Sequence, residues 1–292
     1  MLPLATTALL LIAPAAAHAA YPGKNGRIAF NWTFGCDGSA IATMKRDGSD
    51  RRLLTADPCT SEGAPRAAYP DYDADGKRLV FLSGTRLATV NADGSDEAPL
   101  PIPFLNNANR PSFGPGGGRV AYTRVSGGRQ RIYTAKVDGT DEKRLGTGYS
   151  PRISPNGKSI AFVGTNQRLY IMRASDGEIR RRLDANAGEL DWKPDGKSLV
   201  FTQFDDVYTI KANGDGAAKR IVHSDARELS PVWSPNGKTI AFVRSLKAGE
   251  EDVRYGVFKV PAGGGDTERI YRTSEERTEE TLEALTIAWQ AR

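Results

Sequence analysis

Histidine is almost absent from this 292-residue chain, which contains two. His18 falls in an apolar run at the N-terminus, so His223 is the only histidine in the rest of the sequence. A metal centre built from several histidines is therefore excluded. No Gly-x-Ser-x-Gly motif occurs either, which argues against a hydrolase of the Ser-His-Asp type. We expect His223 to be a solvated loop residue, and we predict no catalytic residue. Carboxylate chemistry on sugars stays open, because Asp and Glu occur in every loop.

A strong charge of one sign is also missing. The chain has 40 Lys and Arg against 35 Asp and Glu, a net charge of +5, with a pI of about 9.1. The basic residues recur along the whole chain and form no single cluster. This distribution argues against a nucleic-acid partner.

Long apolar runs are missing except at the N-terminus. Residues 2–19 carry no charge, have an apolar centre at 8–12 and end in Ala17-His18-Ala19. This pattern predicts a signal peptide over residues 1–19, a mature chain of residues 20–292 and a secreted or periplasmic location. Pro14 interrupts the run, so we expect no stable membrane insertion after cleavage. No Lys or Arg stands near Met1, which leaves a tethered N-terminus open.

A phrase of about 40 residues recurs six times along the chain. Its clearest copies are SPVWSPNGKTIAFV (230–243), YSPRISPNGKSIAFV (149–163) and ELDWKPDGKSLVF (189–201). A bulky residue opens the turn of each copy at steps of 41, 40, 39, 41 and 56 residues: Tyr72, Phe113, Ile153, Trp192, Trp233 and Trp289. Such a period is the signature of a closed repeat architecture.

Each period divides into four short strands. The first strand ends at the bulky residue, and the Asn-Gly or Asp-Gly pair that follows favours a hairpin because these residues accept a positive φ. The second strand is an apolar run such as 240–242, and the third is a run such as 207–210. A second Gly-rich hairpin leads to a fourth strand in which Arg stands beside an apolar residue. Arg on an outer edge strand discourages pairing with other chains.

Six periods of four strands predict an all-β fold, a six-bladed β-propeller of four-stranded antiparallel blades. The first copy begins in the turn, at residues 21–26, without a strand before it. Residues 285–289 resemble a lone first strand with no turn after it. We therefore expect this C-terminal strand to join residues 27–55, which completes blade one and closes the ring.

The only two cysteines fall in blade one. Cys36 lies between its second and third strands, and Cys59 follows its fourth strand. In an up-and-down blade these two connections emerge on the same face, so we predict a disulfide that contributes on the order of 3 kcal/mol. Two free thiols are the alternative.

The copies SPNGKSIAFV, KPDGKSLVF and SPNGKTIAFV, with the strand LYIM and the Asp-Gly hairpins that follow, resemble repeats of the TolB-like propeller family. These WD40-like PD40 repeats occur in bacterial envelope proteins. The resemblance covers about residues 21–289 and implies the propeller fold. It implies little about function, because the motifs hold turns and blade cores. TolB has an additional N-terminal α/β domain without a counterpart in this sequence, so participation in a Tol-Pal system stays open.

One string has metal-like spacing. Residues 71–76, DYDADG, place carboxylates at alternate positions before a Gly, as in the first half of a calcium loop. The twelfth position is Leu82, where such a loop has Glu, and the string coincides with the repeat turn. We expect no cofactor, with calcium at this string as the alternative.

Propellers usually bind partners at the mouth of the central channel, where loops enter the innermost strands. Segments 31–39, 101–109 and 245–255 are predicted as loops on that face, and they carry Trp32, Phe34, Phe104 and Leu105. Exposed apolar residues beside charges suit a protein or peptide ligand. We predict a ligand-binding site made by residues near these entries, with solvated strand ends as the alternative: Asp71, Arg110, Arg152, Glu189, Asp191 and Trp32.

The sequence therefore predicts a monomeric exported propeller that acts as a protein-binding scaffold in the cell envelope or the extracellular space. Its expected partner is an envelope or extracellular protein or peptide. Two alternatives stay open. One is a carbohydrate-binding or carbohydrate-active propeller that uses carboxylates at the channel mouth. The other is a propeller that forms one part of a complex whose catalytic piece is a separate chain.

Overall fold

The structure is a computed structural model that describes residues 21–34, 38–61, 63–103, 110–247, 253–272 and 285–292. The predicted signal peptide lies outside these ranges. Within them the regular structure consists of β-strands and one 3₁₀ turn, η1 (Pro115–Gly117). No helix of the described part is long and apolar enough to cross a membrane.

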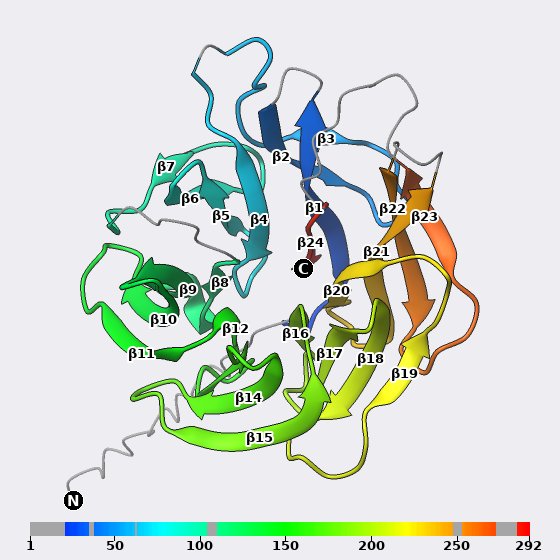
Figure 1. The fold of residues 1–292 in the computed structure, drawn as a ribbon. Helices are drawn as coiled ribbons and strands as arrows, with labels where there is room; N and C mark the ends of the chain where they lie inside the picture. The colour runs from blue at the N-terminus through cyan, green and yellow to red at the C-terminus, as the bar shows by residue number, and fades with distance from the viewer. Residues whose placement is uncertain (1–20, 35–37, 62, 104–109, 248–252, 273–284) are drawn as a thin grey trace, which may run out of the picture.

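The described strands form six four-stranded antiparallel sheets around a central axis, with the innermost strands nearest the axis (Figure 1). The predicted six-bladed propeller is confirmed. Blades one to three consist of β24 (Ile287–Ala291), β1 (Asn25–Phe34), β2 (Gly38–Met44) and β3 (Arg52–Leu53); β4 (Ala67–Tyr72), β5 (Arg78–Ser83), β6 (Arg86–Asn91) and β7 (Ala98–Pro99); β8 (Ser112–Phe113), β9 (Arg119–Ser126), β10 (Arg129–Lys136) and β11 (Lys143–Thr147).

Blades four to six follow the same order from the innermost to the outermost strand. They consist of β12 (Tyr149–Ile153), β13 (Ser159–Val163), β14 (Arg168–Arg173) and β15 (Ile179–Asn186); β16 (Leu190–Trp192), β17 (Ser198–Gln203), β18 (Asp206–Lys211) and β19 (Lys219–Val222); β20 (Glu228–Trp233), β21 (Thr239–Lys247), β22 (Val253–Pro261) and β23 (Glu268–Arg272).

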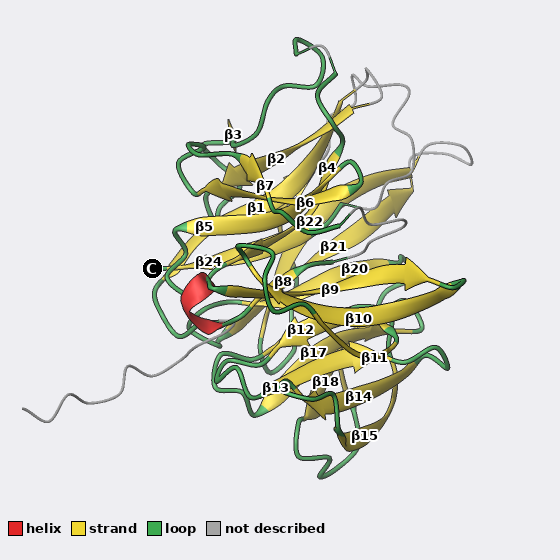
Figure 2. Cartoon of the chain, turned by 90° about the vertical axis from the view of Figure 1, so that its left-hand side faces the viewer, coloured by secondary structure: helices red, strands yellow, loops and turns green. Residues whose placement is uncertain are grey.

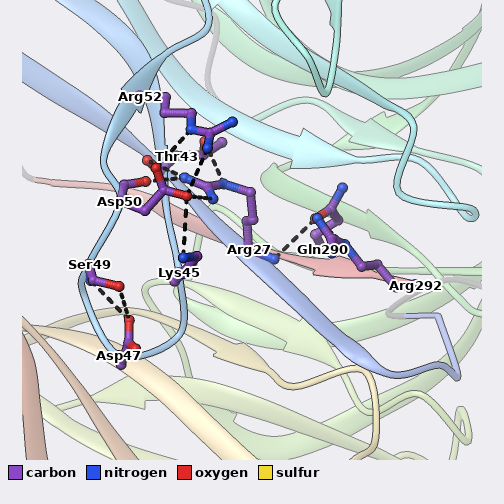
Figure 3. Close-up of polar contacts among 9 residues, drawn as sticks. All are labelled: Arg27, Thr43, Lys45, Asp47, Ser49, Asp50, Arg52, Gln290 and Arg292. Atoms are coloured by element: carbon purple, nitrogen blue, oxygen red, sulfur yellow. Dashed lines mark hydrogen bonds and ion pairs between the residues drawn. The ribbon is translucent and has the colours of Figure 1, made fainter.

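The C-terminal strand closes the ring, as predicted. β24 pairs antiparallel with β1, with Trp289 opposite Ile28. Gln290 ties this strand to two blades: its Oε1 accepts a hydrogen bond of 3.0 Å from the Arg27 backbone N–H, and its Nε2 donates to the Gly76 carbonyl of blade two at 2.7 Å (Figure 3 shows the first of these).

A charged cluster holds the strands of blade one together beside this junction (Figure 3). The Arg27 guanidinium donates to Thr43 Oγ1 and to Asp50 Oδ2, both at 3.0 Å. Arg52 Nε donates to Asp50 Oδ1 at 2.8 Å. Hydrogen bonds from Arg52 and Arg27 lower the pKa of Asp50 to about 2, so this carboxylate stays ionised at every physiological pH.

The hydrophobic core lies between the blades, in six clusters of six or more buried residues, and each cluster draws its residues from two neighbouring blades. Strand β13 shows how one apolar run serves two interfaces. Ile160 and Phe162 pack in the cluster shared with blade three, whereas Ala161 and Val163 pack in the cluster shared with blade five. Because both faces of the sheet are covered, its inner strands need apolar residues at consecutive positions.

The two faces of the disc differ. The hairpins after the innermost strands, η1 and the C-terminus lie on one face (Figure 2), named the turn face here. The opposite face, named the loop face, carries the hairpins between second and third strands and the connections between blades. The prediction of loops over 31–39 and 245–255 is wrong for their described residues. These segments extend the hairpins β1–β2 and β21–β22, which pair as far as Phe34 with Gly38 and Lys247 with Val253.

Gly48 and Gly216 allow a matched test of the contact between blades one and six. Both occupy second hairpins with φ near +80°, at +82° and +84°. A Cβ on Gly48 would lie 1.7 Å from the Ile270 carbonyl oxygen, whereas a Cβ on Gly216 has no atom within 4 Å. We expect Gly216→Ala to lower the free energy of unfolding by about 1 kcal/mol through backbone strain alone. Gly48→Ala should lower it by about 3 kcal/mol or more. Urea denaturation measures both losses of unfolding free energy. Equal losses would contradict a close contact between Gly48 and Ile270.

Candidate functional site

One residue from each innermost strand lines the central channel, at the position just before the bulky residue of the repeat. These six residues, named the channel ring, are Asp71, Ser112, Arg152, Asp191, Val232 and Ala288. With Tyr21 and the neighbouring bulky residues they enclose a cavity of about 40 Å³. Such a cavity has room for about three water molecules. The channel ring therefore contains three of the predicted site residues, Asp71, Arg152 and Asp191.

Side chains of the channel ring accept hydrogen bonds from the backbone of the next blade. Asp71 Oδ2 accepts from the Phe113 N–H at 2.8 Å, and Asp191 Oδ2 accepts from the Trp233 N–H at 2.9 Å. Ser112 Oγ accepts from the Ile153 N–H at 3.2 Å. Each acceptor satisfies a backbone group that would otherwise be buried without a partner.

Arg152 contacts the blades on both of its sides. Its Nη1 donates to the Pro111 carbonyl at 2.8 Å and lies 3.6 Å from Asp71 Oδ1, while its Nε donates to the Leu190 carbonyl at 3.3 Å. The side chain is buried, with a residue exposure of 9%. Arg152 is therefore not a solvated strand end, and its charge is matched by the carboxylates around it.

Burial in the channel changes the titration of these groups. It raises the pKa of Asp191 to about 7, against the opposing attraction of the Arg152 guanidinium. It also raises the pKa of Asp71, again opposed by Arg152. Tyr21 lies beside them, and its hydroxyl has no hydrogen-bond partner among the described residues. Burial and the nearby carboxylates raise the Tyr21 pKa well above its usual value.

Arg110 and Glu189 lie nearer the loop face, where each contacts a neighbouring blade. Their side chains form an ion pair, and each is 13% exposed. The Arg110 guanidinium lies 5.2 Å from the centre of the Tyr69 ring, and Glu189 Oε2 accepts a hydrogen bond from the Ser230 N–H. The structure thus brings these two predicted residues together at the channel mouth.

Trp32 does not belong to this group. It lies on β1, where it pairs with Ala40, and its half-buried ring packs 6.0 Å from Phe30 and 5.9 Å from the Arg51 guanidinium. Its prediction as a loop residue is wrong, because the hairpin of blade one is longer than the repeat suggests. Phe34 is the last residue of β1. Phe104 and Leu105 lie outside the described residues.

The calcium-like string of blade two binds its own backbone. Asp73 Oδ1 accepts from the Lys77 and Arg78 N–H groups at 2.9 and 3.0 Å. Asp75 Oδ1 accepts from the Lys77 N–H at 3.3 Å. Across the described ranges, no three His, Cys, Asp or Glu residues are grouped so that they could hold a metal ion. Calcium at this string stays a prediction.

Cys59 is disulfide-bonded. The chain has one other cysteine, Cys36, which lies outside the described residues, so the pairing itself stays a prediction. His223 has a side chain that is 61% exposed, with Nδ1 3.1 Å from Asp206 Oδ2. It is an exposed histidine that an adjacent buried carboxylate orients.

Two residues that line the channel were not predicted from the sequence. Ser112 occupies the same repeat position as Asp71, in Pro-Ser-Phe against Pro-Asp-Tyr, so alignment of the copies could have found it. Tyr21 stands outside the repeat, and no local pattern indicates that it reaches the channel.

Comparison with known proteins gives consistent matches. A family model described as TolB beta propeller domain matches residues 111–278. A TolB homolog of Chlorobium luteolum is 27% identical over 170 residues, which cover 53% of this chain and 34% of that protein. The Tol-Pal system protein TolB of Francisella tularensis is 26% identical over 148 residues, 46% of this chain and 34% of the relative. The chain therefore spans about a third of these relatives.

Among solved structures, TolB from Acinetobacter baumannii superposes with a TM-score of 0.70 at 20% identity, covering 91% of this chain and 67% of the other. At this identity the likeness shows the fold alone.

Removal of the Arg152 charge should destabilise the propeller. Arg152→Met leaves two channel carboxylates without their cation, and we expect a loss of about 3 kcal/mol in unfolding free energy at pH 7. The loss should be smaller at pH 5, where the carboxylates with raised pKa are more protonated. Arg168→Met is the matched control, because Arg168 pairs at 2.9 Å with the fully exposed Asp184. This substitution should lower the free energy of unfolding by less than about 1 kcal/mol. Equal losses in chemical denaturation would contradict a central role for Arg152.

The raised pKa of Asp191 predicts a pH dependence of stability. The folded protein holds this proton more tightly than the unfolded chain, so the contribution is fully present below about pH 4 and is lost as pH rises through about 7. Asp191→Asn keeps an oxygen acceptor for the Trp233 N–H but cannot ionise. Relative to wild type, this variant should gain on the order of 4 kcal/mol in unfolding free energy between pH 4 and pH 8, about 1.4 kcal/mol for each unit of the raised pKa. Denaturation midpoints at both pH values test it, with Asp184→Asn as the exposed control, and a constant difference would contradict the assignment.

Proposed function

Because the chain belongs to the TolB β-propeller domain family, we propose that it is an exported scaffold that binds a protein or peptide of the cell envelope or extracellular space. The family match covers more than half of the chain, and one relative is named as a protein of the Tol-Pal system. Cys59 is disulfide-bonded, a state typical of oxidising compartments. This supports the signal peptide over residues 1–19, the mature propeller over 20–292 and the Cys36–Cys59 bridge.

The observation that best supports the proposal is that the charged residues of the channel ring are bonded to neighbouring blades. Asp71, Arg152 and Asp191 bond to neighbouring blades, so their charges are explained by the fold without a substrate. The cavity that they line, about 40 Å³, is far smaller than a ligand pocket of 300 Å³ or more. This weighs against sugar chemistry at the channel carboxylates. A partner would instead meet the loop face, where the Arg110–Glu189 pair and Tyr69 surround the mouth.

A protein-binding face needs side chains that the fold leaves partly exposed. Arg110 and Glu189 each keep 13% of their side chains exposed at the mouth. Tyr69 presents an aromatic ring beside them, and aromatic residues and Arg are enriched in protein interfaces. A monomer with one such face would suit a scaffold that holds a single partner.

The test is capture by the immobilised mature chain from an envelope extract of its own organism, followed by mass spectrometry. We expect the wild type to retain at least one envelope protein. An Arg110→Ala, Tyr69→Ala double variant should retain about tenfold less of the same protein. Arg168→Ala, at the outer part of blade four, should retain the same protein. Thermal denaturation of each variant checks that the fold is kept. Equal retention by all three proteins, or retention of no protein, would contradict the proposal.

A further inference from the structure

A cleft of about 410 Å³ opens on the loop face over blades four to six, beside the channel mouth. Its walls come from the hairpin that joins β17 to β18 and from the connections that lead into β16 and β20. The volume falls in the range of small-molecule sites, whereas a protein partner needs a broad surface.

Phe204 stands at the rim of this cleft in a conformation that the fold does not require. It is 78% exposed, and it occupies a two-residue turn with φ +50° at Phe204 and +63° at Asp205. The equivalent turns of blades two and three have Gly84 and Gly127 at the first position, where glycine accepts the positive φ without strain. A bulky aromatic residue held exposed in a strained turn points to a role outside folding.

Polar groups of the cleft are left without partners. The side-chain amides of Asn186 and Gln167 make no hydrogen bond to another described residue, nor does the Tyr149 hydroxyl. Gln203 Oε1 accepts from the Asn186 backbone N–H at 2.9 Å, which leaves its NH₂ group uncommitted. The cleft therefore offers both donors and acceptors, since an amide carries each.

Glu228 lies beneath the same cleft. It is fully buried, and its Oε1 accepts from the Ser224 hydroxyl at 2.7 Å and from Arg244 Nε at 2.9 Å. Its Oε2 has no hydrogen-bond partner in the part of the chain that the structure describes. Because Glu228 is fully buried, a ligand in the cleft does not reach this oxygen, and the role of Glu228 here is its ion pair with Arg244.

Each charged side chain of the cleft has an ion-pair partner, including Glu228, which pairs with Arg244 at 2.9 Å, and this indicates a neutral ligand. Arg110 pairs with Glu189, and Arg227 Nε lies 3.2 Å from Asp205 Oδ1. We infer that this cleft binds a short neutral saccharide. Each sugar hydroxyl donates one hydrogen bond and accepts others, which suits the uncommitted amides of Asn186, Gln167 and Gln203. The apolar C–H face of the sugar ring would lie against the Phe204 ring. The cleft shares Tyr69, Arg110 and Glu189 with the proposed protein-binding face, but binding of a saccharide does not depend on that role.

The experiment is saturation-transfer NMR of the mature protein with glucose, galactose, mannose, N-acetylglucosamine, cellobiose and maltose, each at about 10 mM. A hexose or disaccharide in an open cleft should bind with a dissociation constant of about 1 mM. Sugars that give a signal are then titrated against variants. Phe204→Gly installs the residue of the equivalent turns, so it should keep or raise the melting temperature while weakening binding about tenfold. Asn186→Ala should weaken it about fivefold.

Ile179→Ala is the matched control, because Ile179 is the other large apolar side chain exposed in the described residues, at 51%, and it lies on β15 away from the cleft lining. Its binding should equal that of the wild type. Loss of signal in Phe204→Gly with a retained melting temperature and an unaffected control supports the site. Absence of a signal with every sugar, or binding that survives Phe204→Gly and Asn186→Ala, overturns it.

Discussion

Each blade of this propeller is stabilised chiefly by packing against the blades on both of its sides. The six core clusters all lie between neighbouring blades, including the one that joins blade six to blade one. A blade alone would expose two apolar faces, so no blade is stable until the ring closes around it. This constraint explains why inner strands such as β13 are apolar at consecutive positions and why β24 must return to β1.

Packing of the blades also buries backbone polar groups, and residues of the channel ring supply hydrogen-bond partners for them. Where the innermost strands converge, backbone N–H groups of one blade face the side chains of the preceding blade, and water has little access. Asp71, Ser112 and Asp191 supply acceptors for these groups. Two buried carboxylates would repel each other, and Arg152 between them offsets that repulsion while it donates to the carbonyls of Pro111 and Leu190. The charges in the channel are thus part of the structure that holds blades together.

Most of the fold could be predicted from local patterns in the sequence. The Asn-Gly turns, apolar runs and bulky residues recur within single periods, so their spacing sufficed to predict six blades and the closing strand. The candidate site was harder, because Asp71 meets Phe113 forty-two positions away and only the ring geometry makes them neighbours. The placement of Trp32 failed for a related reason. Pairing continues to Phe34 opposite Gly38, so the hairpin of blade one is longer than the repeat predicts.

Departures from the repeat therefore carry more functional information than the repeat itself. At blade one, the Ala288 side chain cannot accept a hydrogen bond, and two neighbours on the same segment bond to blade two instead: Thr286 Oγ1 accepts from the Tyr69 N–H at 3.1 Å, and Gln290 Nε2 donates to the Gly76 carbonyl at 2.7 Å. That departure is compensated, so it is structural. Phe204 in place of a turn glycine has no such compensation, because its ring is exposed and its φ is strained. A turn that strains the backbone and leaves an aromatic ring largely exposed is what the proposed saccharide site would account for.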